Sequence, residues 1–369
     1  MIPDAEALRQ ILTAGIQAPS AENKHYFCLE VGAQAVTLHA TDCASWPMHP
    51  ERKMLALMSF GAVVENITLR AQALGFMTQA SWRFDSSRVV ELSWQSATRV
   101  VDPLDGAIAT RHTNRRFYRR TPVPSEVLEQ ISAAANCVPG TRVHWLTDGP
   151  QRNLALSLIR IAETERFRRT GLHHEMFSAI RFEHGWHGTV PEGLPLAALQ
   201  VEFPMRWPFA WLRHWRLMRA AHVVGAHQAL GLRSGYLLCA GAPHIGLLMS
   251  EAADVDVAHS QAGRALERLW LAAELHGMAL QPMAAATVLV AQISRPHWVS
   301  AATQKRLSDG LGMLSAKLGV EESDARPCML FRMGRAPTPT AVAGRRPLEQ
   351  FLKAPPSFSS PGLTPSRRP

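Results

Sequence analysis

Two stretches of this 369-residue chain are repeated within it, and the repetition constrains the fold more than any other feature. Segment 6–14 recurs with the same spacing at 126–134, where Glu, Leu, Gln, Ile and Ala occupy matching positions and a proline follows five residues later. Each copy then leads into a short strand-like run, 26–31 and 143–146. Each repeat therefore predicts a helix followed by a strand.

The second repeat aligns 61–75 with 263–277, with Gly, Glu, Leu, Ala and Gly at matching positions. The apolar spacing in both copies is near 3.6 residues, and the closing Gly75 and Gly277 fit left-handed caps. A strand is expected after each cap. Two repeats in the same order indicate duplication, giving an N-terminal half at 1–105 and a C-terminal half at 106–350.

The halves differ in length, because the stretch at about 153–235 has no counterpart in the first half and is predicted to be an insertion. Within it, Trp207–Arg219 is both aromatic and basic. Such a helix can lie on an anionic membrane surface or cover a buried ligand as a flap, and we favour the flap. Residues 351–369 are Pro- and Ser-rich and predict a disordered tail.

The charge balance favours an anionic partner but does not identify one. The chain has 39 Lys and Arg against 30 Asp and Glu, a formal charge of +9. That excess suits an anionic ligand, nucleic acid or an acidic membrane surface.

The cysteines and the N-terminus suggest where the protein resides. Five scattered cysteines without a Cys-x-x-Cys pair indicate neither a disulfide framework nor zinc, and fit a reducing cytoplasm. No secretory signal is recognisable at the N-terminus, and no apolar run approaches the ~20 residues of a membrane span. A soluble protein without stable membrane insertion is expected.

The most informative local segment is 110–120, where Arg111, Thr113 and Arg115 alternate. Arginine forks flanking a hydroxyl match the oxygens of a phosphate monoester. A solvated basic loop or a nucleic-acid contact explains the segment equally well. Neither a Gly-x-Gly-x-x-Gly turn after a strand nor a P-loop is present, so a mononucleotide held by arginines remains open.

A second loop, Ala18–Asn23, lies between the first predicted helix and strand and presents a hydroxyl and an amide. Small polar loops in that position commonly hold ligands. Taken alone, however, the pattern is ordinary helix-ending turn chemistry.

Together these motifs resemble the nitroreductase superfamily. Segment 111–115 and the following helix with Pro124 and Leu128 are similar to the family's FMN-phosphate segment, and Ala18–Asn23 resembles its flavin-edge loop. The helix 263–277 with Leu280–Met283 resembles the helix and strand beside the flavin ring. Phe331–Arg335 resembles the family's last strand. Arg345 and Arg346 resemble a second basic contact to the FMN phosphate.

The resemblance implies an α+β, nitroreductase-like fold in which two fused degenerate copies form a pseudo-dimer. The phosphate segment precedes only the second copy and the intact Ala-Pro-Ser-x-x-Asn loop occurs only in the first, so one FMN per chain would bind between the halves. Within the superfamily, the chain resembles the fused two-repeat, Acg-like branch. The expected assembly is a monomer or a loose homodimer.

The implied chemistry is two-electron transfer from NAD(P)H through FMN to a small electron-poor acceptor of nitroaromatic or quinone type. Catalytic acids are not required. An FMN-binding or sequestering protein with little turnover is the alternative. The implied cofactor-binding residues are Arg111, His112, Thr113, Arg115, Pro19, Ser20, Asn23, Gln281, Pro282, Met283, Arg345 and Arg346.

The chain departs from the family at two places. His25 follows the loop where relatives place Gln-Pro-Trp, and Pro282–Ala284 replaces a Glu-Gly, so only a backbone N–H could face flavin N5 there.

Two other groups of residues were considered as sites. The histidines at 173, 174, 184 and 187 have no acidic or cysteine partner at convincing ligand spacing, so no metal is expected. The tryptophans at 207, 211, 215 and 270 have helical spacing that favours packing over stacking on nucleic acid, and no nucleic-acid partner is expected.

Overall fold

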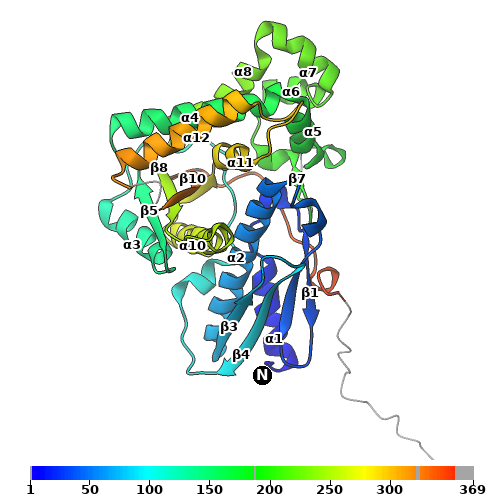
Figure 1. Cartoon of the computed structure of the whole chain (residues 1–369), viewed down its shortest axis with the longest axis vertical. Coiled ribbons are helices and arrows are strands. Elements are labelled where there is room, and N and C mark those ends of the chain that lie inside the picture. The colour runs from blue at the N-terminus through cyan, green and yellow to red at the C-terminus, as the bar shows by residue number, and fades with distance from the viewer. Residues whose placement is uncertain (1, 187, 321–324, 354–369) are drawn as a thin grey trace, which may run out of the picture.

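The computed structural model describes residues 2–186, 188–320 and 325–353. Its helices surround two four-stranded antiparallel sheets, with a two-stranded parallel pair beside them (Figure 1). The expected α+β class is therefore confirmed.

The first half is built in the order helix, two strands, helix, two strands. Helix α1 (Ala5–Ile16) precedes β1 (Phe27–Val31) and β2 (Val36–Ala40), and α2 (Pro50–Ala73) separates them from β3 (Phe76–Trp82) and β4 (Arg88–Ser96). The strand order is β1-β2-β4-β3, and α1 packs on α2. The buried faces of these elements form one apolar core.

The second half repeats this plan. Its elements are α3 (Ser125–Asn136), β5 (Thr141–Trp145), β8 (His244–Ser250), α10 (Val255–Leu275), β9 (Ala279–Pro282) and β10 (Arg326–Gly334). The strand order β5-β8-β10-β9 matches that of the first sheet position by position, and α3 packs on α10 as α1 packs on α2. The shared topology supports the proposed duplication.

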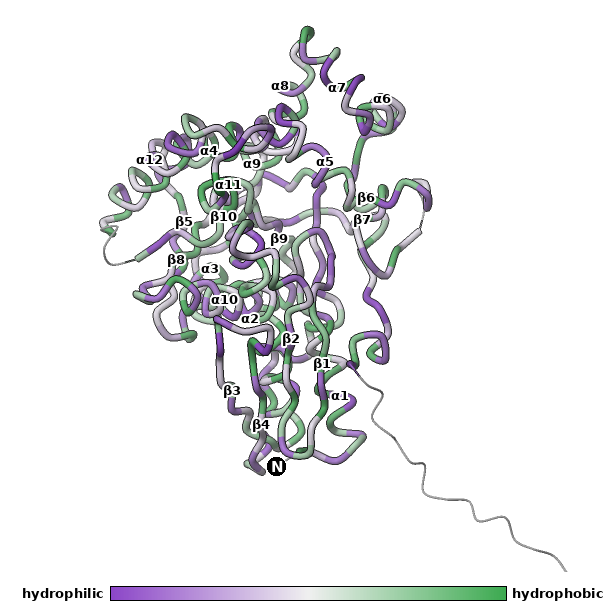
Figure 2. The backbone as a smooth tube through the Cα atoms, turned by 45° about the vertical axis from the view of Figure 1, so that its right-hand side comes forward, coloured by the Kyte–Doolittle hydropathy of each residue, from purple (hydrophilic) through white to green (hydrophobic). Residues whose placement is uncertain are grey.

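Helices α2 and α10 cross between the two sheets, and glycine allows them to touch (Figures 1 and 2). A Cβ on Gly61 would lie 2.1 Å from the Ser260 carbonyl oxygen, and one on Gly263 would lie 2.0 Å from the Met58 carbonyl oxygen. Gly61 and Gly263 are the aligned residues of the second repeat, and Met58 and Ser260 lie three residues before them. The contact is thus self-complementary, like an interface across a two-fold axis.

The ends of both central helices follow the sequence expectation. Gly75 and Gly277 follow the helices with φ of 86° and 66°, in the left-handed region that glycine favours. Strand β3 begins directly after Gly75, and β9 begins one residue after Gly277.

The insertion lies between β5 and β8, where the first half has only the tight turn at 32–35. It extends from Asp148 to Gly241, somewhat beyond the predicted 153–235, and has a small apolar core of its own. Its helices are α4 (Gly149–Arg168), α5 (Thr170–Ser178), α6 (Arg206–Trp211), α7 (Trp215–Ala221), α8 (Ala226–Gly231) and α9 (Leu238–Ala240), with a π-helical turn at Leu232–Leu237.

Four shorter or peripheral elements complete the description. The parallel pair β6 (Ile180–Arg181) and β7 (Leu194–Pro195) belongs to the insertion. Helices α11 (Ala285–Ala291) and α12 (Ala301–Lys317) pack with α4 over the second sheet.

The predicted tail boundary at 351 is wrong. Phe351 is fully buried against Phe27 at a ring-centroid distance of 4.9 Å, and Leu352 forms a bridge with Leu29. These contacts anchor the chain to the outer strand of the first sheet. The rest of the predicted tail, 354–369, lies outside the described residues.

One helix, α2, is long and apolar enough to cross a membrane by length and composition, contrary to the expectation that no segment would qualify. Of its apolar window, 72% is buried inside the protein, against α10, α1 and α11. This is the pattern of a core helix, and the membrane signal is weak.

We predict that Gly263→Ala lowers the free energy of unfolding by about 2 to 4 kcal/mol, because a methyl group at the helix crossing forces the backbones apart. Gly149→Ala is the matched control, since a Cβ there meets nothing within 4 Å. Chemical denaturation followed by circular dichroism measures both. Equal stability of the two variants would show that the close crossing is not required.

Candidate functional site

A cavity of about 620 Å³ lies where the two halves and the insertion meet. The first half contributes the loop after α1 and one face of α2, and the second half contributes segment 113–115 and the end of β9. The insertion supplies residues of α4, α5, α6 and α8. The volume suits a cofactor-sized ligand, and apolar side chains form most of the wall.

The predicted site residues divide into two sets. Seven line the cavity: Pro19, Ser20, Thr113, Arg115, Gln281, Pro282 and Met283. They come from three segments that are far apart in the sequence. The other five, Asn23, Arg111, His112, Arg345 and Arg346, do not line it.

Arg115 is the cation of the cavity wall that lacks an acidic partner. The other basic side chains in the wall, Lys24, Arg52, Arg166 and Arg233, each pair with a glutamate. Arg115 has no acidic group within 4 Å among the residues described, and its guanidinium donates only a long 3.4 Å bond to the Ala198 carbonyl. Burial lowers the pKa of Arg115 to about 10. An anion bound here would compensate a charge that the protein leaves unpaired.

The loop after α1 is held in an unusual conformation. Glu22 and Asn23 both have positive φ, 55° and 56°, which costs a non-glycine residue roughly 1 kcal/mol or more. The Ser20 hydroxyl is buried in the cavity wall without a hydrogen-bond partner in the part of the chain that the structure describes. A ligand group that bonds this hydroxyl would therefore be favoured.

Asn23 holds this loop in place instead of contacting the cavity. Its amide donates to the carbonyls of Gly193 (3.1 Å) and Gly344 (3.2 Å), and its Oδ1 accepts from Arg345 at 2.6 Å. One buried side chain thus connects the loop to the insertion and to the C-terminal segment. The structure places Asn23 as a positioning residue.

Arg111 is likewise directed away from the cavity. It is buried, pairs with the fully buried Glu267 at 3.2 Å and stacks over Trp270 at 4.6 Å. It also donates to the Gln17 carbonyl at the end of α1. The predicted phosphate contact is replaced by an ion pair within the second half, and the bond to Gln17 connects Arg111 to the first half.

Arg345 and Arg346 also bind the protein itself. Arg345 donates to the carbonyls of Gln17 and Ala18, both at 3.1 Å, and so satisfies the C-terminus of α1. Arg346 donates to the His25 carbonyl at 3.0 Å and lies over Phe351. Both side chains fix the loop after α1 from behind.

His112 does not face the cavity either. Its Nδ1 lies 2.8 Å from the Thr110 carbonyl oxygen, and its own carbonyl accepts from the Trp270 indole at 3.2 Å. It holds the start of segment 111–115 against α10.

The backbone of Pro282–Met283 lines the cavity, but the Met283 N–H is already used. It donates to the Leu330 carbonyl at 2.7 Å. Of the three positions expected to offer a backbone N–H to flavin N5, Pro282 has no N–H and Met283 has none to spare. Ala284, the next residue, also lines the cavity.

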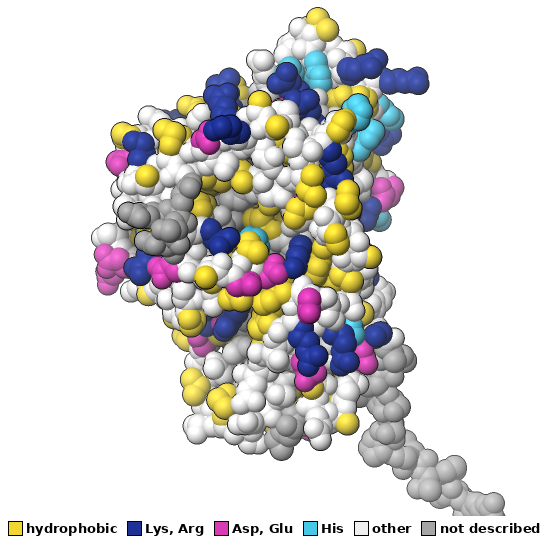
Figure 3. Space-filling view, in the orientation of Figure 1, with side chains coloured by type: hydrophobic (Ala, Val, Ile, Leu, Met, Phe, Trp, Pro, Cys, Tyr) yellow, Lys and Arg dark blue, Asp and Glu magenta, His cyan; other side chains and the backbone are white. Residues whose placement is uncertain are grey.

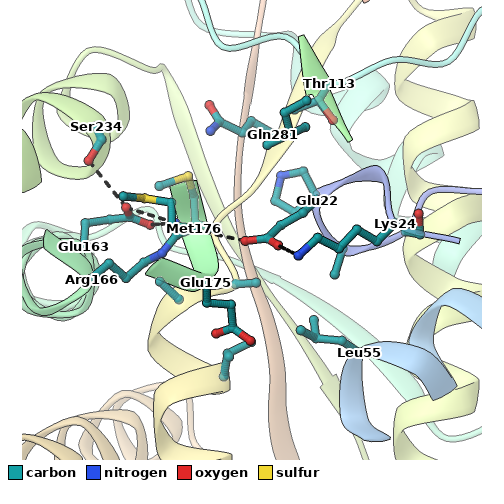
Figure 4. Close-up of a pocket in the computed structure, with 18 of the residues that line it drawn as sticks. Glu22, Lys24, Leu55, Thr113, Glu163, Arg166, Glu175, Met176, Ser234 and Gln281 are labelled. Carbon is teal, nitrogen blue, oxygen red and sulfur yellow. Dashed lines mark hydrogen bonds and ion pairs between the residues drawn. The ribbon is translucent and has the colours of Figure 1, made fainter. Parts of the chain in front are cut away.

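A chain of charges across the cavity was not predicted from the sequence (Figure 4). Glu22 lies between Lys24 at 3.0 Å and Arg166 at 3.9 Å, and Arg166 continues to Glu163 at 3.3 Å. Glu163 in turn accepts from the Ser234 hydroxyl at 3.4 Å. No residue spacing in the sequence predicts this network, because it joins the loop of the first half to two helical segments of the insertion.

Arg332 is a second residue that the sequence analysis did not single out as a site residue, and it organises segment 114–118. Fully buried, it donates to the Gln281 side chain at 2.6 Å and to the carbonyls of Arg116 (2.9 Å) and Leu238 (3.1 Å). It also stacks over Tyr118 at 3.8 Å. One side chain therefore fixes segment 114–118 and β9 relative to each other.

The structure also shows where the clustered histidines and the tryptophans lie. Among the described residues no three His, Cys, Asp or Glu side chains are grouped to hold a metal; His173 contacts the Leu212 carbonyl, and His187 lies outside those residues. Trp270 is buried and Trp215 packs on His173. Trp207 and Trp211 are exposed, so the packing prediction is wrong for them. All five cysteines are free.

No family model and no curated protein matches the chain. Among solved structures, the chain is similar to the FMN-dependent nitroreductase NfnB from Mycobacterium smegmatis in complex with NADPH, at 19% identity over 63% of this chain and 87% of that one, TM-score 0.35.

Two further solved structures are similar at the same level. A nitroreductase with bound FMN from Desulfitobacterium hafniense shares 15% identity over 67% and 95% of the two chains, TM-score 0.34. The NADPH:FMN oxidoreductase from Vibrio harveyi complexed with NAD+ shares 12% identity over 67% and 74%, TM-score 0.34. Likenesses this low do not by themselves assign a function.

We predict that Arg111→Ala lowers the free energy of unfolding by about 3 to 5 kcal/mol, because it leaves Glu267 buried and unpaired. Arg111→Met combined with Glu267→Leu should recover most of that loss, since neither charge then remains. Urea unfolding of the three proteins measures this. A stable Arg111→Ala protein that fails only to bind FMN would restore Arg111 to the phosphate site.

A second prediction concerns His25, which is buried behind the loop. Burial, with Arg345 and Arg346 adding repulsion, lowers the pKa of His25 from 6.5 to about 3. The unfolded chain therefore binds this proton first, and stability is lost as the pH falls from 6.5 towards 3. The free energy of unfolding of the wild type should fall by about 1.4 kcal/mol for each pH unit lost in that window, and His25→Phe should remove this dependence. Parallel unfolding curves for both proteins at each pH would contradict the assignment.

Proposed function

We propose that this chain is an FMN-dependent oxidoreductase related to the nitroreductases. It would transfer two electrons from NAD(P)H to an electron-poor small molecule of nitroaromatic or quinone type. The observation that carries the proposal is the meeting of the loop after α1, segment 113–115 and the end of β9 in one cavity. These are three segments that the family resemblance assigns to FMN.

The cavity residues fit the chemistry of FMN. Arg115, with the Thr113 hydroxyl beside it in the sequence, offers an unpaired cation and a donor for a phosphate. Ser20 offers an unsatisfied buried hydroxyl for a polar ring edge. Leu55, Met58 and Met283 supply apolar surface suited to a flat aromatic ring.

When bound, the flavin would supply the hydride and electron chemistry. The protein's own residues bind and orient it. Asn23 and Arg345 hold the Ser20 loop, and Arg332 holds the Arg115 segment against Gln281. The apolar wall from the insertion, including Phe209 and Leu212, limits water at the ring.

One FMN per chain is expected, because the residues of the proposed site come from both halves and occur once. A monomer or loose homodimer in a reducing cytoplasm is consistent with this arrangement. Two flavins per chain, measured by absorbance of the denatured protein, would contradict a shared site.

A protein that binds FMN without turnover is the second candidate. The same insertion wall that limits water would also obstruct nicotinamide and bulky acceptors, and the Met283 N–H is unavailable to flavin N5. The reduction experiment below separates the two candidates.

We predict that the purified protein, reconstituted with FMN, shows a flavin spectrum near about 450 nm that bleaches on addition of NAD(P)H. Arg115→Ala should weaken FMN binding by about 2 kcal/mol, roughly 30-fold in Kd, without changing the unfolding curve. Arg119→Ala is the matched control, an exposed arginine of the same segment outside the cavity wall.

Fluorescence titration with FMN gives the affinities, and stopped-flow absorbance gives the reduction rate. Binding without bleaching would favour the sequestering protein. Equal affinities of wild type, Arg115→Ala and Arg119→Ala would contradict the phosphate assignment.

A further inference from the structure

The projecting end of the insertion exposes an unusual amount of aromatic and aliphatic surface. We call this part, residues 203–224, the tip; it comprises α6, α7 and the turns around them. Trp207 is 72% exposed, Trp211 is 63% exposed and Val223 is 90% exposed. Phe203, Leu217 and Val224 are exposed as well. Exposed apolar surface of this extent on one projection marks a binding surface.

The tip is also cationic. Arg213, Arg216 and Arg219 are exposed, and the sequence from 203 to 250 contains no Asp or Glu. None of the three arginines has an acidic side chain within 4 Å in the described part of the chain. In the space-filling view, basic, histidine and hydrophobic side chains gather over this end of the molecule (Figure 3).

The inner face of the tip anchors it to the protein. Met218 is fully buried in the small core of the insertion, and Phe209 and Leu212 line the cavity. His173 fixes the turn after α6 through the Leu212 carbonyl at 2.8 Å. The outer Trp and Arg side chains are therefore presented by a packed scaffold and are not needed for its core.

We propose that the tip docks on an anionic phospholipid surface. Tryptophan is favoured at the membrane–water interface, because its ring is apolar while its N–H remains hydrated. Arginines beside it are attracted to acidic headgroups, and each arginine near the surface adds to the binding free energy. Helix α6 exposes Trp207 and Trp211 one turn apart, Phe203 lies in the turn before it, and the arginines follow on and before α7, so a short amphipathic segment lying in the interface accounts for the exposed rings and the charge.

Surface docking would place the cavity close to the bilayer. Met205 is 46% exposed in the tip and also lines the cavity, so the cavity borders the surface there. If the proposed oxidoreductase function holds, this position suits a lipid-soluble acceptor of quinone type. The docking itself does not depend on that function.

The test is co-sedimentation of the full chain with phosphatidylcholine vesicles, with and without phosphatidylserine. We expect binding only to the anionic vesicles, weakened by salt. The triple substitution R213Q/R216Q/R219Q should reduce the apparent affinity by about 100-fold. W207A/W211A should reduce it by about tenfold, since two interfacial rings are lost.

The matched control is R88Q/R99Q/R306Q, which removes three exposed arginines away from the tip and should bind like the wild type. Unfolding curves verify that every variant is folded, and no flavin signal is needed. Absence of vesicle binding, or equal loss in the control, would overturn the proposal. So would tip-dependent dimerisation in sedimentation velocity, or binding of duplex DNA in place of vesicles.

Discussion

Helices α2 and α10 make a close backbone contact that fixes how the two halves of the protein are arranged. Gly61 and Gly263 let two helix backbones meet at a separation that any side chain would prevent. Because each sheet is packed around one of these helices, the crossing sets how the two halves face each other. The cavity lies along that seam, with Met58 on one side and Gly263 on the other. A shift of the crossing would therefore change the shape of the site.

Buried polar residues then lock the loops that this arrangement brings together. Glu65 on α2 accepts from Arg264 and Arg268 at 2.8 Å, and Glu267, its aligned residue on α10, pairs with Arg111. The pairs of Glu65 with Arg264 and Arg268 cross between the halves, and because removing one partner of a buried ion pair is costly, they favour one relative position of the halves. Asn23 and Arg332 do the same for the two segments that reach the cavity. Arg115, in the cavity wall, is left without an acidic partner among these described groups.

The inner and outer surfaces of the insertion differ in what they contact. Its inner surface closes the cavity with apolar side chains and with the Glu163–Arg166 pair, which reaches Glu22 of the first half (Figure 4). Its outer surface carries the exposed tryptophans and arginines of the tip. Only the second half is extended in this way, so the duplicated plan supports a single, asymmetric site.

Sequence periodicity and cap chemistry predict the repeated helices, their glycine caps, the strands that follow them and the approximate insertion, because these signals are local. The motif resemblance brought Ser20, Thr113, Arg115 and Gln281 into one site. The folded structure shows that Arg111 and Arg345 bind other parts of the protein and do not line the cavity. The sequence could not show this, since an arginine beside a phosphate and one beside a buried glutamate look alike in sequence. The ion pairs that join Glu22 to Arg166 and the exposure of Trp207 are likewise visible only in the folded structure. These depend on which distant elements pack together, and no local spacing encodes that.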